Sequence, residues 1–470
     1  MESDQEESAP QIHQSVEVGK NGLPLNVVHD TPNSSRNSSS ENSLSDPKED
    51  EITPDASGDA SYVEDSNDAR DVIGRTSFMG TVLNLLNSTL GAGILGVPNT
   101  FVNTGIILSI IILLIMAVLS TIATDLLLVL GKETNARSLG EMAEKVLGRP
   151  GSLTLTILNL IFSLTALVAY LVLAGDMIAS FFELANIDLS PLGWHALMVL
   201  VYALCIPIAL TIPRNVAFLR YFSTITVFCI FFFCIAMLYK FIDNHGVSKT
   251  IKMVNCDLSL FSSLSVYALT FSFPSVIFAV VQTYEDNLKK RKNVVLVALL
   301  FCIFFIVFPG IFGYLIFGAD TDPNILKNFE AKDVLIIICR IVFLVIVTCA
   351  YPMVAQNHES MWSTLIFKDG SPSTLITWKR AIVLVLTNIF PLIVAMFLPS
   401  VKPALSIGGA LGGCLVDFVF PSVLYLKLHR GEEPLYHWKN ALLIIFAVFG
   451  IVAAVISTYQ SIVDAIDSFS

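Results

Sequence analysis

The stretch Phe78–Thr104, FMGTVLNLLNSTLGAGILGVPNTFVNT, decides the fold of this 470-residue chain. It is apolar and long enough to cross a bilayer, which takes about 20 residues of helix. Its middle nevertheless carries Gly91, Gly93 and Gly96, with Pro98 just beyond. Glycine costs about 1 kcal/mol relative to alanine inside a helix, so this cluster predicts a break in a spanning helix.

A break inside a membrane has two explanations. Unpaired backbone groups cost several kcal/mol each in hydrocarbon, so a break persists only where it lines a cavity or binds a ligand. Broken spanning helices of this kind form the substrate sites of secondary transporters. Alternatively, the glycines let a neighbouring helix pack closely, as small residues do in membranes. The stretch alone leaves both explanations open.

The composition is that of a polytopic membrane protein. Hydrophobic residues make up 54% of the chain and charged residues only 14%. Mean hydropathy is +0.71, and apolar runs long enough to span recur along the chain. The net charge of the chain is −11, and its acidity comes from the first 73 residues, which hold 17 acidic and four basic residues and so carry −13. This segment, 1–73, predicts a disordered acidic tail, and it lacks the basic and apolar regions of a cleaved signal peptide.

About eleven segments after the tail are long enough to cross a bilayer, which predicts an all-α membrane domain over 74–470. Lys and Arg are concentrated in the connections on the same side as the tail, so we expect the tail in the cytosol. The segments are 78–101, 105–130, 152–182, 194–212, 217–240, 262–284, 294–317, 333–356, 380–398, 403–427 and 440–463.

The spacing of these segments predicts a duplication. The first five and the next five begin with a constant offset of about 185 residues. Because each unit has an odd number of helices, the second unit must enter the membrane from the opposite face. We therefore expect an inverted repeat of 78–240 and 262–427, followed by an extra helix over 440–463.

The repeat makes 262–284 the partner of the first span. It contains TFSFPSVIFAV, where Pro274 removes a backbone donor. The helix should therefore open at Phe271–Ser275. Two breaks at matching places in two repeats favour a binding site over simple close packing.

Polar residues near the first break are candidate cation ligands. Asn84, Asn87 and Ser88 share one helical face, and their oxygens suit a hard cation. Thr348, in the middle of span eight, is the natural second side-chain ligand. The alternative for Thr348 is a hydroxyl bonded to its own helix carbonyl, which is the commoner state of a membrane threonine.

Four ionisable residues lie inside or near the ends of spans, where such groups are expensive and usually functional. Asp176 and Asp417 are candidate proton-titrating sites, and pairing with a neighbouring group is the alternative for each. Snorkelling or local pairing explains Asp125 and Arg340.

Several classes of function are disfavoured. The GGALGG run at 408–413 indicates helix packing, and no Walker-type motif for ATP is present. Neither a Ser/His/Asp arrangement nor a metal-ligand cluster occurs, and the eight cysteines show no metal-type pairing, so we expect neither an enzyme nor a bound cofactor. The absence of a basic patch disfavours nucleic acid.

These segments resemble a known family. LNLLNSTLGAGILGVPNTFVNTG is similar to the first-helix signature of the amino acid/auxin permease family, especially its sodium-coupled neutral amino acid transporter branch. SLGEMAEKVLGRPG resembles the first cytosolic loop of that family, AYLVLAGDMIASFF its third helix, and ALSIGGALGGCLVDFVFPSVLYLKL its tenth. The match runs from about residue 75 to the end of the chain.

The resemblance implies cotransport of amino acids through a LeuT/APC-like five-plus-five inverted repeat with an eleventh helix. It associates the first-helix Asn87 and the eighth-helix Thr348 with Na⁺. The chain departs from this branch in FPSVIFAVVQTYED of span six and in AQNHESMW, which lacks the basic residue often found at the inner end of span eight. These departures leave the substrate and the coupling ion open.

We therefore expect a secondary active transporter that moves neutral amino acids by alternating access, coupled to Na⁺. The substrate carboxylate should meet amides freed around Gly91 and Gly93, next to Thr89. The substrate ammonium should meet carbonyls around Phe271 and Ser272.

Two alternatives follow from the same residues. The first is an H⁺-coupled transporter or exporter, with Asp176 or Asp417 carrying the proton. The second, from another class, is a receptor that binds an amino acid and signals through its acidic tail. The expected partners are the amino acid and the lipid bilayer, in a plasma membrane or a vacuole- or lysosome-like membrane.

Overall fold

The first span begins at a capped helix and is broken as predicted. In the computed structural model, the side chain of Ser77 accepts a hydrogen bond from the Gly80 amide and so caps α2 (Phe78–Leu90). The chain resumes as α3 (Gly93–Thr104), and the two helices meet at an angle of 55°. The structure describes residues 76–91, 93–187, 192–213, 220–244, 246–368, 375–431 and 437–469. The predicted disordered tail, 1–73, lies outside these residues.

Regular structure within the described residues is entirely helical. The other elements are α4 (Ile106–Thr134), α5 (Leu139–Leu184), α6 (Leu192–Cys205), η1 (Ala209–Thr211), α7 (Arg220–Asp243), α8 (Leu260–Thr270), α9 (Phe273–Val281), α10 (Leu288–Phe317), η3 (Gly318–Asp320), η4 (Ile325–Asn328), α11 (Val334–Phe367), α12 (Thr377–Phe397), α13 (Lys402–Gly408), η5 (Gly409–Val419), α14 (Phe420–Leu428) and α15 (Trp438–Phe469).

The expected number of spans is confirmed. Ten helical segments of the described chain are long and apolar enough to cross a membrane, and the bent pair α2–α3 makes an eleventh. Large apolar side chains remain exposed on the outer helices, as lipid-facing positions require. On α4 they recur at the helical spacing of Ile107, Ile111, Leu114 and Val118.

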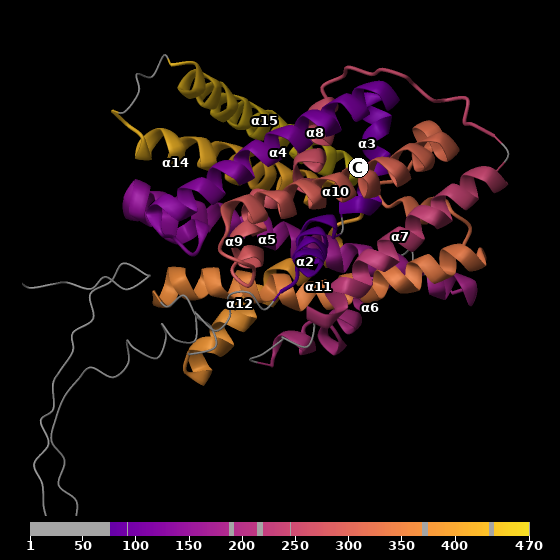
Figure 1. Ribbon diagram of the computed structural model, residues 1–470. Helices are drawn as coiled ribbons and strands as arrows, with labels where there is room; N and C mark the ends of the chain where they lie inside the picture. The colour runs from indigo at the N-terminus through magenta and orange to yellow at the C-terminus, as the bar shows by residue number, and fades with distance from the viewer. Residues whose placement is uncertain are drawn as a thin grey trace, which may run out of the picture. The chain divides into compact units, whose positions relative to one another are not determined.

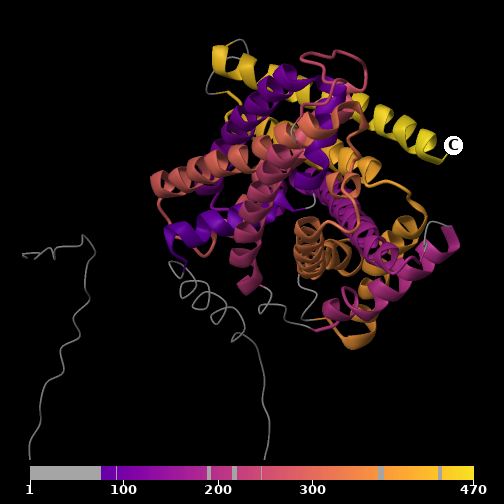
Figure 2. The same ribbon diagram turned by 90° about the vertical axis from the view of Figure 1, so that its right-hand side faces the viewer.

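Spans six and ten lie in the interior of the bundle. The segments Leu260–Val281 and Lys402–Leu428 have 72% of their most apolar window buried, against 50% or less for the other single-segment spans. Figures 1 and 2 show α14 and α15 at one edge, with α6 and α12 at the opposite edge. The helices that carry the predicted site are therefore shielded from lipid by the others.

Two elements differ from the expected boundaries. The segment SLGEMAEKVLGRPG, which resembles a cytosolic loop, begins as a helix because Ser138 caps the start of α5. The chain leaves helical geometry at Gly148, whose φ of 75° suits glycine, and then resumes the helix. The GGALGG run packs against other helices as expected. Its helix, η5, is however wound as a π-helix, which the composition of the run did not indicate.

Candidate functional site at the helix breaks

The first break brings bare backbone close to two neighbouring helices. Gly91, with φ −10° and ψ −132°, ends α2 in a non-helical conformation. A Cβ atom on Gly91 would lie 2.7 Å from the hydroxyl oxygen of Tyr170 on α5, and one on Gly93 would lie 3.2 Å from Cγ2 of Thr270. A side chain at either glycine would therefore press on Tyr170 or Thr270, in addition to the preference of the break for glycine.

The second break lies at Phe271 and Ser272, as the sequence predicts. Their φ/ψ pairs, −115°/26° and −70°/47°, interrupt the run from α8 to α9. Pro274 stands in the first turn of α9, where a missing amide hydrogen costs no helical bond. Proline thus starts the second half-helix and does not kink a continuous one.

A cavity of about 570 Å³ lies between the two breaks. The residues predicted to bind substrate that line it are Thr89, Gly91, Gly93 and Ser272. Its walls carry hydroxyls and carboxamides, and no Asp, Glu, Lys, Arg or His of the described chain is among them. The carboxamides are Asn84, Asn87, Asn159, Gln356 and Asn357.

The cavity extends from the breaks toward one side of the bundle. We call the side where α2 begins the tail side and the opposite one the far side. Thr283 follows α9 and also lines the cavity, and its hydroxyl accepts a hydrogen bond of 2.9 Å from Thr76, just before α2. Asn357 lines the cavity from the tail-side half of α11 and is exposed, as is Ser88 deep in α2. The structure is therefore open on the tail side of the breaks.

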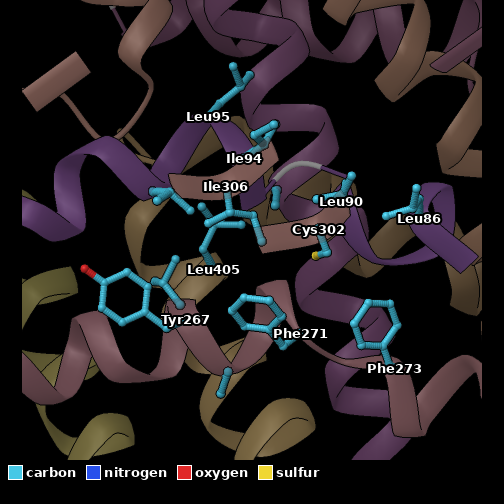
Figure 3. Packing of buried hydrophobic residues seen from close by; sticks show 14 of the residues in the cluster. Leu86, Leu90, Ile94, Leu95, Tyr267, Phe271, Phe273, Cys302, Ile306 and Leu405 are labelled. Atoms are coloured by element: carbon cyan, nitrogen blue, oxygen red, sulfur yellow. The ribbon is translucent and has the colours of Figure 1, made fainter. Parts of the chain in front are cut away.

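Phe271 does not reach the cavity. Its side chain is fully buried, and Figure 3 shows its ring within the cluster of buried side chains that includes Leu90 and Cys302. Its carbonyl oxygen accepts hydrogen bonds from the Ser120 hydroxyl at 2.5 Å and from the Phe273 amide at 2.7 Å. This carbonyl thus already accepts two hydrogen bonds, and the predicted contact with a substrate ammonium stays a prediction.

Asn87 and Thr348 are not brought together. Asn87 lines the cavity, whereas the Thr348 hydroxyl donates to the Leu344 carbonyl at 2.5 Å and lies 2.6 Å from the Tyr202 hydroxyl on α6. Residues two apart on a helix face opposite sides, and it is Ala350 that lines the cavity. Thr348 is thus bonded to its own helix, which is the alternative raised by the sequence.

Asp176 is paired on the far side of the breaks. Its carboxylate lies 3.6 Å from Nζ of Lys327 and accepts a hydrogen bond of 3.1 Å from Asn324. Lys327 is in η4, outside the spans, and the negative charge of Asp176 raises the pKa of its ammonium group. For Asp176 the structure supports pairing.

The other two peripheral ionisable groups also have local partners. Asp125 pairs with Lys292 at 3.1 Å. The buried guanidinium of Arg340 donates to carbonyls of the η4 region, namely those of Leu326, Phe329 and Ala331. These contacts give both residues structural roles.

Asp417 differs from the other ionisable groups. Its side chain is fully buried, and one carboxyl oxygen accepts a hydrogen bond from the Ser275 hydroxyl. The other oxygen, Oδ2, has no hydrogen-bond partner. Ser272 and Ser275 both line the cavity, so Asp417 lies directly behind its wall.

Three residues of the site were not predicted. Tyr170, Ser120 and Ser275 approach the two breaks from α5, α4 and α9. The sequence does not indicate how deep in the membrane a hydroxyl of an apolar span lies, or which way it points. Only Ser275, which follows Pro274, could have been expected near a break.

Among the described residues no group of three His, Cys, Asp or Glu side chains could hold a metal ion.

Comparison with known proteins agrees with this geometry. A family model described as transmembrane amino acid transporter protein matches residues 74–463. The chain is 26% identical to the sodium-coupled neutral amino acid symporter 2 of Danio rerio over 393 residues, 77% of each chain.

Two solved structures share the fold. One is the manganese transporter of Eremococcus coleocola in complex with an aromatic bis-isothiourea substituted compound, with a TM-score of 0.52, 13% identity and coverage of 82% of this chain and 86% of that one. The other is MhsT in complex with L-phenylalanine, with a TM-score of 0.50, 14% identity and coverage of 83% and 100%. The expected LeuT-type fold is confirmed.

Proposed function

Because the chain belongs to the transmembrane amino acid transporter family, we propose that it is a secondary active transporter of neutral amino acids that works by alternating access. The observation that carries this proposal is the cavity between the two helix breaks, which offers backbone ends and uncharged side chains to a small zwitterion. An enzyme is not expected of this family.

The two half-helices bind the charged ends of the amino acid. The carboxylate lies at Gly91 and Gly93, where the amino end of α3 carries a partial positive charge. The ammonium lies at the carboxyl end of α8, next to the Ser272 hydroxyl. This assignment replaces Phe271, whose carbonyl is occupied by Ser120.

The absence of charge on the described cavity walls supports selection of neutral side chains. A charged substrate side chain would lose its water in this cavity without gaining an opposite charge, and such burial is costly. Zwitterions with uncharged side chains avoid this cost. Acidic and basic amino acids are therefore expected to be poor substrates.

The coupling ion of the proposal is Na⁺, with the Asn87 carboxamide oxygen as a ligand at the first break. Oxygen ligands suit a hard cation, and the relative from Danio rerio is named as sodium-coupled. The ion acts through its different affinity for the two states of the transporter. With the tail in the cytosol, the cavity seen here faces the cytosol.

Uptake of labelled amino acids into proteoliposomes tests the proposal. A panel of neutral, acidic and basic amino acids is offered with Na⁺ and pH gradients imposed separately. Accumulation of neutral amino acids supports transport, and its loss in choline supports Na⁺. Asn87→Ala should weaken the Na⁺ dependence by about ten-fold, whereas the matched variant Thr348→Val, which faces α6, should not change it.

The same preparation separates the alternatives. Uptake that is unchanged in choline and follows the pH gradient makes the H⁺-coupled mechanism primary. A protein that binds amino acids without accumulating any would favour the receptor, and deletion of residues 1–73 should then abolish partner binding. A transporter should keep its flux after that deletion.

A further inference from the structure

Span ten is pressed directly against the broken span six. A Cβ atom on Gly409 would overlap the carbonyl oxygen of Ser265, and one on Gly413 would lie 2.8 Å from the backbone of Ala268. Gly409, Gly413 and Asp417 follow one another at intervals of four residues and so recur on one side of the helix. The glycines therefore bring the η5 backbone against α8, and the next position on that side places Asp417 at the break.

The Asp417 carboxyl faces the first turn of α9. It accepts the hydrogen bond of the Ser275 hydroxyl, and Ser272 and the Ser275 backbone also interact with it. Ser272 occupies the N-cap position of α9, but its side chain forms no capping hydrogen bond with that helix. π-helical turns such as η5 occur frequently at functional sites.

No Lys, Arg or His side chain of the described residues pairs with the Asp417 carboxyl. The thiol of Cys414, on the same helix, interacts with it electrostatically. On the packed helices, Asp125 of α4 is paired with Lys292, and Tyr267 of α8 is bonded to Thr104.

Two further charged groups near η5 also have other partners. The carboxylate of Asp464 on α15 is paired with Lys402, and the imidazole of His429, which follows α14, lies against Glu133. A charged carboxylate with one unpartnered oxygen is strongly disfavoured in a dry interior, whereas a protonated carboxyl is tolerated.

We propose that Asp417 is a proton-binding site of the transport cycle, with the proton carried on Oδ2. This inference rests on the proposed function, since it adds a proton to the Na⁺ that the proposed function couples to transport at the same central site. The proton forms an O–H bond on Oδ2 while the cavity is open to the tail side, and it leaves when the packing of η5 on α8 and α9 changes. Ser272 and Ser275 separate the carboxyl from the cavity, so the proton has a short path to water.

Proton binding and amino acid binding are then linked. Loss of the proton leaves a carboxylate that needs additional donors, and the nearest are at the amino end of α9. Protonation of Asp417 thus favours one packing arrangement of the helices at the second break over another. In the proposed function the substrate binds at the same break. Such linkage is reciprocal, so substrate binding must change proton affinity at Asp417.

The test measures amino acid counterflow, accumulation driven by an imposed pH gradient, and proton movement with a pH dye inside proteoliposomes. Asp417→Asn keeps the size of the side chain and removes the titration. It should reduce substrate-driven proton movement by about ten-fold or more and make exchange independent of pH. The matched control Asp125→Asn removes a partly exposed carboxylate that is paired with Lys292, and it should keep the proton movement of the wild type.

Ser275→Ala provides a second, milder variant. It removes a hydrogen bond that favours the charged carboxylate, so the pH at which exchange is half-maximal should rise. This shift is expected even if Asp417→Asn folds poorly, and substrate-induced thermal stabilisation shows which variants are folded.

The results separate the inference from the proposed function. Wild-type protein without counterflow would overturn the transporter itself. Counterflow without proton movement, an unchanged midpoint in Ser275→Ala, or proton movement retained in Asp417→Asn would overturn the proton site alone.

Discussion

The carbonyl oxygen of Phe271 is stabilised by a single side chain from another helix. The Ser120 hydroxyl donates to it at 2.5 Å in a fully buried position. Leaving such a carbonyl with fewer donors costs about 1–3 kcal/mol. We therefore predict that Ser120→Ala lowers the melting temperature of the purified protein without weakening the binding of a neutral amino acid.

Thr121→Ala is the matched control for that variant. The hydroxyl of Thr121 donates only to the Ala117 carbonyl of its own helix, so its loss should change the melting temperature little. Equal melting temperatures for Ser120→Ala and Thr121→Ala would show that the Phe271 carbonyl does not depend on α4.

Single residues mark the limit of what the sequence predicts. Thr89, Gly91, Gly93 and Ser272 line the cavity as expected, because glycine and proline identify a backbone break locally. Phe271 does not, because its environment depends on Ser120 from a helix about 150 positions away along the chain. Likewise, the composition of span eight does not indicate whether Thr348 lies on the helix face that lines the cavity or on the opposite face.

At the scale of elements, the close contact between η5 and α8 depends on glycine residues of η5, which have no side chain at the contact. A Cβ atom on Gly409 would overlap the Ser265 carbonyl, which is backbone and cannot rotate away. Overpacking of this kind typically costs about 1–3 kcal/mol. We predict that Gly409→Ala lowers the melting temperature, because the two helices must separate.

Gly193→Ala serves as the control for helix substitution, since nothing lies within 4 Å of a Cβ atom at Gly193 on α6. It should be neutral or slightly stabilising. A Gly409→Ala protein as stable as Gly193→Ala would refute the close packing of the two helices.

The helices themselves were predictable because hydrophobic length determines a span. All eleven expected segments are present, and both breaks lie where Gly91 and Pro274 indicate. The π-helical winding of η5 was not predictable, because the hydropathy pattern does not distinguish a π-helix from an α-helix. The helical start of α5 depends on the Ser138 cap, a signal that the hydropathy pattern does not contain.

For the whole molecule, closure of the far side depends on contacts of the loop between α10 and α11. Lys327 pairs with Asp176, and the Asn99 side chain donates to the Thr321 carbonyl at 2.5 Å. Lys327→Met should weaken this closure and populate the far-side-open state. A cysteine at Asn103, which lines a small far-side pocket, should then react faster with a membrane-impermeant maleimide in a cysteine-free background.

The pH dependence of this pair has a definite sign. Because the pKa of Lys327 is raised by Asp176, the stabilisation is complete below the ordinary lysine pKa of about 10.4. It is lost as the pH rises through the raised value, so the far side should open at strongly alkaline pH. Lys332→Met, on the same loop but exposed, is the control, and equal reactivity in both variants would contradict the role of the pair.

The conformational state could not be predicted from the sequence. An inverted repeat implies two related states, and their relative free energies depend on many contacts of a few kcal/mol or less. The tail-side opening appears only when the lining of α2, α5, α9 and α11 is seen together.

Counterflow of a labelled neutral amino acid in proteoliposomes tests most directly whether the two breaks form the substrate site. The decisive variant is Gly91→Val, whose side chain would enter the space between the first break and the Tyr170 hydroxyl. With Gly193→Val as the folded control, we predict that Gly91→Val loses counterflow by about 100-fold, as expected for loss of a required orientation. Counterflow at the wild-type rate in a folded Gly91→Val protein would contradict the account.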